Sequence, residues 1–514
     1  MTRKTVALGA ASLVILVLVF STFLDHPGSE GVVDGEKTSG PGLSAAAGPV
    51  DDEAFAEEQR EFYEKLRART EAADRAPLPE PEAIVRRAAE SVPETRQPLS
   101  YINNKVWEGE ALFGRAVDWE PEIAADPGAP YVYWATTRYG KKYQLCRDCP
   151  SPLIVYRVSS DNGDTWGPVL PLCKCKGYRW QADPQIEVAS DGTVYALILQ
   201  GWRTVLVKSM DHGVTWSKPK DVARSMDWTD HGFLTISDNG QDVYVAFNHG
   251  ESWVAASHDG GATFAKPVKT SPLKDENRRY YYHYKGAVLS NGVVAIAATS
   301  LSARPYARHN VRYYILRSAN GGTSWRQIPI GTYKRQPECP RSRCRGDHLG
   351  GMTNVAKDDN DNLVATVAGA TRRANGQVVY VLTSTDDGLT WSAPVRISPI
   401  RHGDRRVIAS FPTIEGTGDG DFRLWWQDNY NGLNGWNTWY RQSSDTGATW
   451  SEKIRISDAI DGAFYKSRMG YLADYGDYGG IAIMSDGRTI ATWGEGKSYW
   501  GAGGSWVNRP LGSG

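Results

Sequence analysis

The sequence predicts an all-β fold built from a repeated unit of four antiparallel strands. An octapeptide of the form Ser-x-Asp-x-Gly-x-Thr-Trp recurs at intervals of roughly fifty to sixty-five residues, which indicates a repeated supersecondary unit. Two or three short runs of alternating apolar residues precede each copy, as expected of half-buried strands. The copies span residues 159–166, 209–216, 257–264, 318–325, 384–391 and 443–450.

The residue types of the octapeptide explain a tight turn. The Asp carboxylate and the Ser and Thr hydroxyls can hydrogen-bond nearby backbone N–H groups, and the Gly allows a left-handed backbone. The Trp supplies a large apolar surface for packing. Phe264 replaces the Trp in the third copy, and Asn320 replaces the Asp in the fourth. We therefore expect a structural role for these turns.

The second repeat shows the expected strand order. Its strands are predicted at 185–189, 193–199, 204–209 and 218–223, with the octapeptide between the third and fourth. Residues 478–496 form a further two-strand hairpin that no octapeptide follows. Residues 505–509 would add a third strand to this hairpin, and a segment within 101–112 would add the fourth. Because such pairing closes a ring and removes exposed sheet edges, we prefer seven units over six.

The octapeptide resembles the Asp-box, or BNR, repeat of the sialidase superfamily of β-propellers. The resemblance covers residues 101–514 and implies a propeller of four-stranded antiparallel blades. It also implies that the octapeptides lie on the face away from the active site. Sialidases of this family have six blades, so the seventh hairpin is a departure from the family pattern.

The N-terminal part of the chain predicts export. Residues 5–24 form an apolar run that would span about 30 Å as a helix, and Arg3 and Lys4 precede it. We therefore predict a signal anchor or transmembrane helix at 1–25, with the propeller extracytoplasmic at the cell membrane. A removed signal peptide, which would give a secreted protein, is the alternative. Residues 26–100 are predicted to be a linker and a short helical stalk.

The charge balance of the sequence limits the classes of binding partner. Lys plus Arg number 58 and Asp plus Glu number 59, a net charge of −1 that gives no basis for nucleic-acid binding.

The six cysteines are expected to form disulfides, because export places the chain in an oxidising compartment. We expect one cysteine pair to cross-link another pair, and a third pair to form a local bridge. A four-thiolate zinc site from the first four cysteines is the alternative. The two cross-linked pairs are Cys146 with Cys149 and Cys173 with Cys175, and the local bridge is Cys339 to Cys344.

The candidate site follows from strand connectivity. In antiparallel blades, the links into each first strand and the loops between second and third strands share one face, at the mouth of the central channel. Several titratable residues fall there. The positions before first strands hold Arg179, Asp183, Asp230, His231, His283, Asp347, His348, Asp477 and Tyr478, and the ends of second strands add Arg138, Arg372 and Glu495.

The resemblance suggests roles for these residues. Sialidases use a Tyr nucleophile, an Asp acid/base and arginines that hold the substrate carboxylate, whose geometry matches the guanidinium fork. Tyr478 occupies the place of the nucleophile, with Asp477 beside it, and Arg312 lies upstream of the fourth octapeptide as one substrate-binding Arg does in the family. Asp230 or Asp347 would be the acid/base. The carboxylate would be held by Arg138, Arg179 and Arg372. The neighbouring His231 and His348 are not typical of sialidases, and Asp–His pairs of this kind would suit proton transfer in another glycosidase or in a lyase.

We therefore expect an exported sialidase-like glycosidase acting on an acidic sugar or related glycan, with no metal and no cofactor. Asp183, His283 and Glu495 would contribute to substrate binding. No Phe/Tyr-Arg-Ile-Pro motif precedes the first octapeptide, which favours the alternative of a non-catalytic propeller that binds glycans or proteins. A polysaccharide lyase using His and Tyr is a further alternative.

Overall fold

The structure is a computed structural model in which parts of residues 111–510 are described. The described ranges are 111–113, 116–139, 145, 149–172, 180–224, 226, 228–249, 251–271, 279–302, 310–334, 352–370, 376–402, 405–430, 436–457, 478–496 and 503–510. The predicted membrane helix, linker and stalk at 1–100 lie outside these residues. Within the described ranges, no helix combines the length and apolar character needed to cross a membrane.

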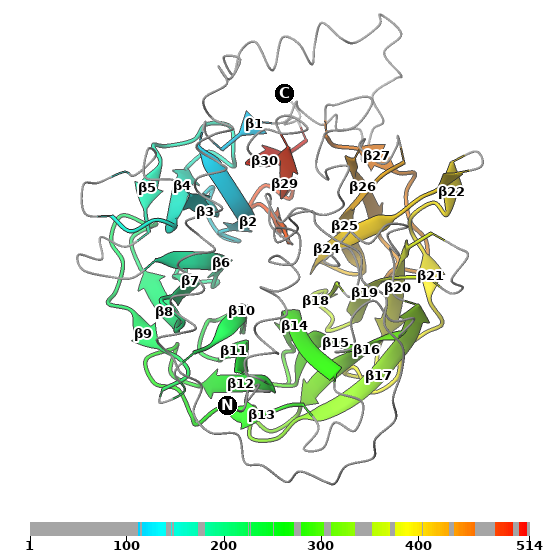
Figure 1. The fold of residues 1–514 in the computed structure, drawn as a ribbon, viewed down its shortest axis with the longest axis horizontal. Helices are drawn as coiled ribbons and strands as arrows, with labels where there is room; N and C mark the ends of the chain where they lie inside the picture. The colour runs from blue at the N-terminus through cyan, green and yellow to red at the C-terminus, as the bar shows by residue number, and fades with distance from the viewer. Residues whose placement is uncertain are drawn as a thin grey trace, which may run out of the picture.

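Seven four-stranded antiparallel blades are arranged in a closed ring (Figure 1), which confirms the preference for seven over six. Residues of their first strands line the central channel. Blade 1 is β2 (Val117–Ala125), β3 (Val132–Tyr139), β4 (Leu153–Ser159) and β5 (Leu170–Pro171). Blade 2 is β6 (Gln181–Val188), β7 (Val194–Gln200), β8 (Thr204–Ser209) and β9 (Lys220–Asp221). Blade 3 is β10 (Asp230–Ile236), β11 (Val243–His249), β12 (Glu251–Ser257) and β13 (Val268–Lys269).

The remaining blades follow the same order around the ring. Blade 4 is β14 (Arg279–Val288), β15 (Val294–Ser302), β16 (Asn310–Ser318) and β17 (Arg326–Lys334). Blade 5 is β18 (Thr353–Lys357), β19 (Leu363–Gly369), β20 (Val378–Ser384) and β21 (Val395–Arg396). A two-stranded ribbon, β22 (Arg401–His402) with β23 (Arg405–Arg406), precedes blade 6. Blade 6 is β24 (Ala409–Thr417), β25 (Asp421–Asp428), β26 (Asn437–Ser443) and β27 (Ile454–Arg455).

Blade 7 closes the ring with both ends of the propeller sequence. It joins β28 (Gly480–Ile483), β29 (Thr489–Gly496) and β30 (Gly503–Asn508) to the N-terminal β1 (Ala111–Leu112). Strand β1 pairs antiparallel with β30, with Ala111 opposite Val507. The predicted closure, with its third strand from the C-terminal end and its fourth from the N-terminal end, is therefore confirmed.

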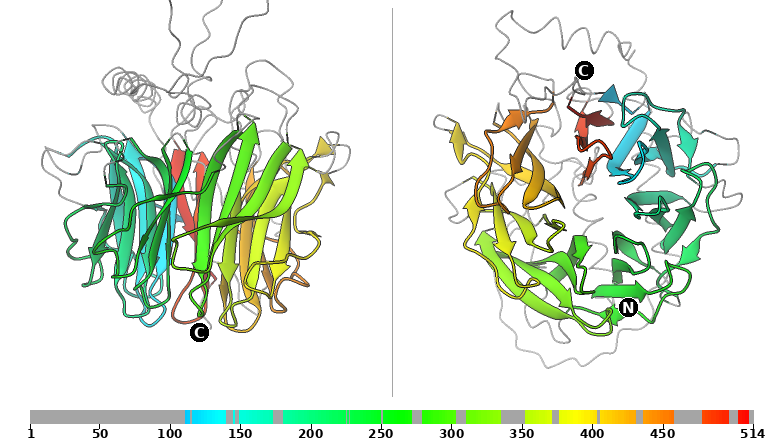
Figure 2. Two further views of the ribbon diagram at one scale, coloured as in Figure 1. Left: turned by 90° about the horizontal axis from the view of Figure 1, so that it is seen from below. Right: turned by 180° about the vertical axis from the view of Figure 1, so that it is seen from behind.

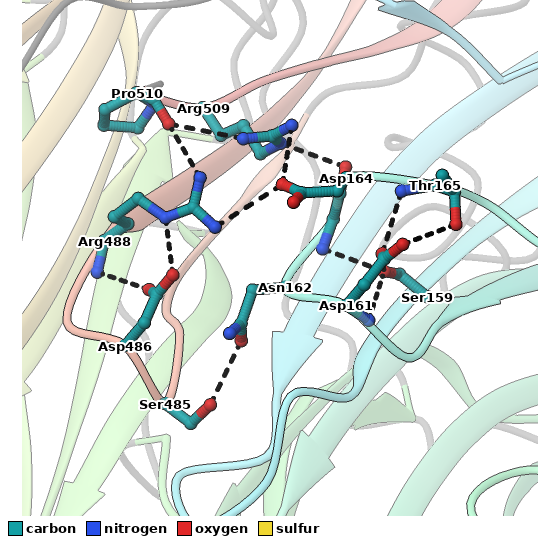
Figure 3. A network of polar contacts seen from close by, with 11 residues as sticks. Ser159, Asp161, Asn162, Asp164, Thr165, Ser485, Asp486, Arg488, Arg509 and Pro510 are labelled. Atoms are coloured by element: carbon teal, nitrogen blue, oxygen red, sulfur yellow. Dashed lines mark hydrogen bonds and ion pairs between the residues drawn. The ribbon is translucent and has the colours of Figure 1, made fainter. Parts of the chain in front are cut away.

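A polar network holds blade 7 to blade 1 (Figure 3). The carboxylate of Asp164, within the first octapeptide, lies 2.8 Å from Nη2 of Arg509 and 3.5 Å from Nη2 of Arg488. Arg509 Nε also donates to the Gly163 carbonyl at 3.0 Å. Both arginines are buried, so they find their partners within the seam rather than in water.

The first strand of each blade lies nearest the channel, and first strands of neighbouring blades contact one another (Figures 1 and 2). Apolar side chains fill the space between adjacent blades, where Trp134, Trp425, Trp426 and Trp493 are fully buried. Burial of such large side chains is the main stabilising contribution in this fold. The strands run from one face of the ring to the other (Figure 2), so each blade presents its turns on two opposite faces.

The octapeptides form the turns expected from their residue types. In the second copy, Asp211 accepts hydrogen bonds from the backbone N–H of Thr215 at 2.8 Å and from its hydroxyl at 2.5 Å. Ser209 Oγ accepts the N–H of Gly213, whose φ is 83°. Asn162 of the first copy accepts the hydroxyl of Ser485, which lies in a turn between first and second strands. The octapeptides and these turns therefore share one face, as predicted.

The turn carboxylates predict a stability change at low pH. Hydrogen bonds from Thr215 and Ser209 lower the pKa of Asp211 to about 2. A depressed native pKa stabilises the fold above the unfolded pKa and loses this effect as pH falls through the native value. We expect Asp211→Ala to lower the melting temperature at pH 7 and the difference to shrink towards pH 2. Asp359→Ala, an exposed position near the same face, is the control, and a deficit that stays constant with pH would contradict the assignment.

Of the six cysteines, the described residues include Cys149, which is disulfide-bonded. Cys146, Cys173, Cys175, Cys339 and Cys344 lie outside the described residues. The predicted pairing therefore stays a prediction.

Candidate functional site at the mouth of the channel

A repeated irregularity marks the first strands near the predicted mouth. In blades 1, 2, 3, 4 and 6, the register between first and second strands shifts at a bulge. Four of these bulges hold a non-glycine residue with a left-handed backbone, namely Glu120, Asp183, His231 and Phe411, with φ of 53°, 54°, 49° and 55°. Such conformations are uncommon, and bulges redirect side chains next to functional sites.

Asp183 and His231 were predicted site residues, whereas Glu120 and Phe411 were missed. A signal for both was present in the sequence, because a Pro directly follows Glu120, Asp183 and Phe411. Proline inside a strand is largely confined to edge strands and bulges. A proline at the same place in the first strand of three blades therefore indicates a repeated bulge.

Tyr478 reaches from blade 7 to blades 2 and 3. Its hydroxyl donates a hydrogen bond to the carbonyl oxygen of Pro184 at 3.2 Å, and Pro184 directly follows Asp183 in the chain. Its ring lies 5.8 Å from the ring of Phe233 in blade 3. Because these residues are separated by hundreds of positions in the sequence, the ring closure alone brings Tyr478 to the Asp183 bulge.

His231 lies in the same aromatic group. Its ring centroid is 5.0 Å from Phe233, 5.7 Å from Tyr282 and 5.8 Å from Tyr284. Asp230 precedes it, is 4% exposed, and accepts the backbone N–H of His231 at 2.9 Å. The predicted residues Tyr478, Asp183, Asp230 and His231 therefore lie around one region of the channel.

Glu120 belongs to the blade next to Tyr478. A Cβ placed on Gly480 would collide with the carboxylate of Glu122, so the start of β28 lies against β2. Glu120 lies two residues before Glu122 in β2, and Tyr478 lies two residues before Gly480, just ahead of β28. The Glu120 carboxylate is half-buried and accepts the hydroxyl of Thr137 at 3.3 Å.

His283 lies behind this region rather than in it. It is 0% exposed, and its Nε2 contacts the hydroxyl of Ser252, which lies 2.5 Å from the hydroxyl of Thr270. Burial, with a smaller contribution from His231, lowers the pKa of His283 to about 3. The imidazole is therefore neutral at physiological pH, between blades 3 and 4.

Three other predicted binding residues have separate environments. Arg138 forms a bidentate ion pair with the fully buried Asp118, through Nε at 2.9 Å and Nη2 at 3.0 Å. Glu495 is buried and accepts the indole N–H of Trp493 at 3.0 Å. Arg312 is exposed on β16, the third strand of blade 4. The structure thus does not bring these three side chains together at the mouth.

The remaining predicted site residues lie outside the described ranges, and their roles stay predictions. They are Arg179, Asp347, His348, Arg372 and Asp477. Among the residues that the structure does describe, no group of three or more His, Cys, Asp or Glu side chains could hold a metal ion.

At the opposite end of the channel lies a cavity of 510 Å³. It opens among the turns between first and second strands, such as Asp238, Asp359 and Ser485. Lys285 lies at this cavity and contacts Glu187 and Glu415 at 3.1 Å each. Burial opposes its charge, but these carboxylates raise its pKa above the usual range. Sequence reasoning did not predict this ion cluster.

The sequence matches no protein-family model and no curated protein. Among solved structures, the chain is similar to a Hadza microbial sialidase, with 14% identity, a TM-score of 0.39 and coverage of 77% of this chain and 66% of that one. It is also similar to a protein of unknown function from Dyadobacter fermentans, with 15% identity, a TM-score of 0.45 and coverage of 80% and 99%.

A third similar structure is Trypanosoma rangeli sialidase in complex with sialic acid, with 13% identity, a TM-score of 0.37 and coverage of 79% and 57%. The chain thus spans slightly less than two thirds of the microbial sialidase and little more than half of the trypanosomal one. The assignment of a propeller fold is based on the strand pairing of this chain. The sialidases are structures to which that fold is similar.

Proposed function

We propose that the protein is an exported sialidase-like glycosidase that acts on an acidic sugar or related glycan at the mouth of its channel. The observation that carries the proposal is the contact of Tyr478 with the Asp183 bulge and with the aromatic group around His231. A phenol, carboxylates and an imidazole at one end of the channel supply groups that can serve as nucleophile, acid and base in glycosidic hydrolysis.

In this proposal Tyr478 is the nucleophile and Glu120, on the adjacent blade, receives its proton. The neutral phenol suits attack at an anomeric carbon that bears a carboxylate, because an anionic nucleophile would be repelled. Asp183 or Asp230 acts as the acid that protonates the departing oxygen and then as the base that activates water. Before it reacts, the Tyr478 hydroxyl breaks its hydrogen bond to the Pro184 carbonyl and turns towards the anomeric carbon of the substrate.

Hydrolysis of aryl glycosides tests this proposal. With a panel of fluorogenic acidic glycosides that includes an aryl α-sialoside, we expect Tyr478→Phe to lower kcat/KM by roughly a hundredfold, the range of a lost reacting group. Tyr195→Phe is the matched control, because its hydroxyl also donates to a backbone carbonyl, that of Gly240 at 3.0 Å. Full activity in Tyr478→Phe would exclude the assigned nucleophile.

One observation favours a second candidate, a non-catalytic glycan-binding propeller. Three arginines are predicted to hold the substrate carboxylate, and of these Arg138 lies within the described residues. Its guanidinium group is already paired with Asp118 and is therefore not available to a substrate carboxylate. If the wild-type protein binds acidic glycans without hydrolysing any member of the panel, and Tyr478→Phe binds them equally well, the second candidate replaces the first.

A further inference from the structure

We propose that three tryptophans beside the mouth form a second sugar-binding subsite, which takes a neutral pyranose unit of an oligosaccharide. The rings of Trp180 and Trp202 are 4.7 Å apart and nearly perpendicular, and those of Trp202 and Trp228 are 5.6 Å apart and stacked. These three residues are called the indole platform below. Trp202 is buried at its centre, whereas Trp180 and Trp228 are half-buried and present part of their surface outward.

The backbone of the indole platform is strained. Trp202 has φ of 67° and Trp228 has φ of 74°, a region that bulky residues rarely adopt. Such conformations persist only where the surroundings hold them, and they gather at ligand sites. Here hydrogen bonds supply that support. The Trp202 carbonyl accepts the Thr229 N–H at 2.9 Å, and the Trp228 carbonyl accepts Nδ1–H of His249 at 2.9 Å.

The indole platform lies next to the proposed catalytic residues. Trp180 directly precedes β6, which carries Asp183, and Trp228 lies two residues before Asp230. Trp202 belongs to the short loop between β7 and β8. These loops and links lie on the mouth face, so a glycan bound at the Asp183 bulge can extend a neighbouring unit towards the indoles.

The chemistry of the indole platform favours a neutral sugar ring. Indole faces carry negative potential and attract the C–H groups on the flat side of a pyranose, while they bury its apolar surface. The adjacent Arg203 is paired with Asp221 at 2.7 Å, so this nearby charge is neutralised. The inference rests on the proposed function for its place in the substrate, but its ligand can be measured separately.

The first measurement compares two substrates. For Trp228→Ala and Trp180→Ala, we expect the ratio of kcat/KM for 3′-sialyllactose to that for an aryl α-sialoside to fall roughly tenfold, which corresponds to about 1.4 kcal/mol. Trp228→Phe should restore much of the ratio because it keeps a flat ring, and thermal melting verifies folding. Trp253→Ala, a half-buried indole of blade 3 outside the platform, should leave the ratio unaltered. A ratio that is equal in all variants overturns the inference.

The second measurement is independent of catalysis. Lactose, cellobiose and mannobiose are titrated against Tyr478→Phe by tryptophan fluorescence and by ligand-observed NMR. Saturable binding of at least one disaccharide that Trp228→Ala weakens roughly tenfold supports the indole platform, even where no glycoside is hydrolysed and the proposed function fails. Absence of binding by all three disaccharides overturns the inference. The proposed function still stands in that case if the wild-type protein hydrolyses the aryl sialoside.

Discussion

Asp118→Asn is expected to destabilise the propeller by about 3 to 5 kcal/mol, because it leaves a buried guanidinium without its counter-charge. Asp118 is 0% exposed and Arg138 is 7% exposed, and the two side chains are direct cross-strand neighbours in β2 and β3. Two parallel N–H···O bonds join them. Urea unfolding at pH 7, with the slope compared between variants, measures the loss.

A double-mutant cycle separates the ion pair from the packing around it. Arg138→Met keeps most of the side-chain volume and removes the charge, and Asp118→Asn combined with Arg138→Met should recover part of the stability lost in either single variant. Arg203 with Asp221 is the matched surface pair, with side chains 48% and 28% exposed, and Asp221→Asn should cost less than about 1 kcal/mol. Equal losses at both pairs would refute the effect of burial.

The same pair has a functional consequence. A substrate carboxylate would have to displace Asp118 to use Arg138, and the cost of separating a buried ion pair makes this unfavourable. We therefore expect Arg138 variants to lose stability and activity together. A rise in KM without a loss of stability would instead indicate that Arg138 contacts substrate.

The difference in unfolding free energy between Glu122→Gln and wild type is expected to change in favour of the variant by roughly 2 to 4 kcal/mol between pH 5 and pH 8. Burial raises the pKa of Glu122 to about 8, although the charge of Lys285 opposes this shift. A raised native pKa favours the protonated state, so its stabilising contribution is complete below the unfolded value of 4.5 and is lost as pH rises to about 8. The amide introduced by Glu122→Gln does not titrate in this range, so the variant lacks that dependence.

Urea unfolding of wild type and Glu122→Gln across pH 5 to 8 measures this difference. Glu452→Gln, at an exposed carboxylate of blade 6, is the control and should shift stability equally at each pH. Glu187 responds in the same direction, since burial also raises its pKa. Parallel stability curves for wild type and Glu122→Gln would show that Glu122 is ionised in the native state throughout this range.

Most of the fold could be predicted from local sequence patterns. The octapeptide carries its own hydrogen-bond partners within a few residues, as the contacts of Ser209, Asp211 and Thr215 show. Its period located the blades, and the hairpin without an octapeptide identified the seventh. The fourth strand of blade 7 was predicted within 101–112, because a ring leaves no other partner for the last sheet edge.

The candidate site was only partly predictable. Tyr478, Asp183, Asp230 and His231 were expected at the mouth from their places before or within first strands, and the structure brings them together. Glu120 was missed although the proline that follows it, as at Asp183 and Phe411, indicated a repeated bulge. The indole platform was missed because its assembly depends on backbone angles that residue types do not reveal. The sequence predicts that Arg138 binds the substrate carboxylate, because the residue pattern does not reveal the strand register that places Asp118 directly opposite Arg138.

By itself, the sequence determined the repeated unit, the number of blades and the face on which the turns lie, because these depend on contacts within a few residues and on strand alternation. Only the tertiary structure decided which charges are already neutralised, as in Asp118 with Arg138 and in Lys285 with Glu187 and Glu415. It also decided which aromatic rings meet across blades. The physical reason is that electrostatic and stacking interactions act over a few ångströms between residues far apart in the chain, so they exist only after the ring has closed.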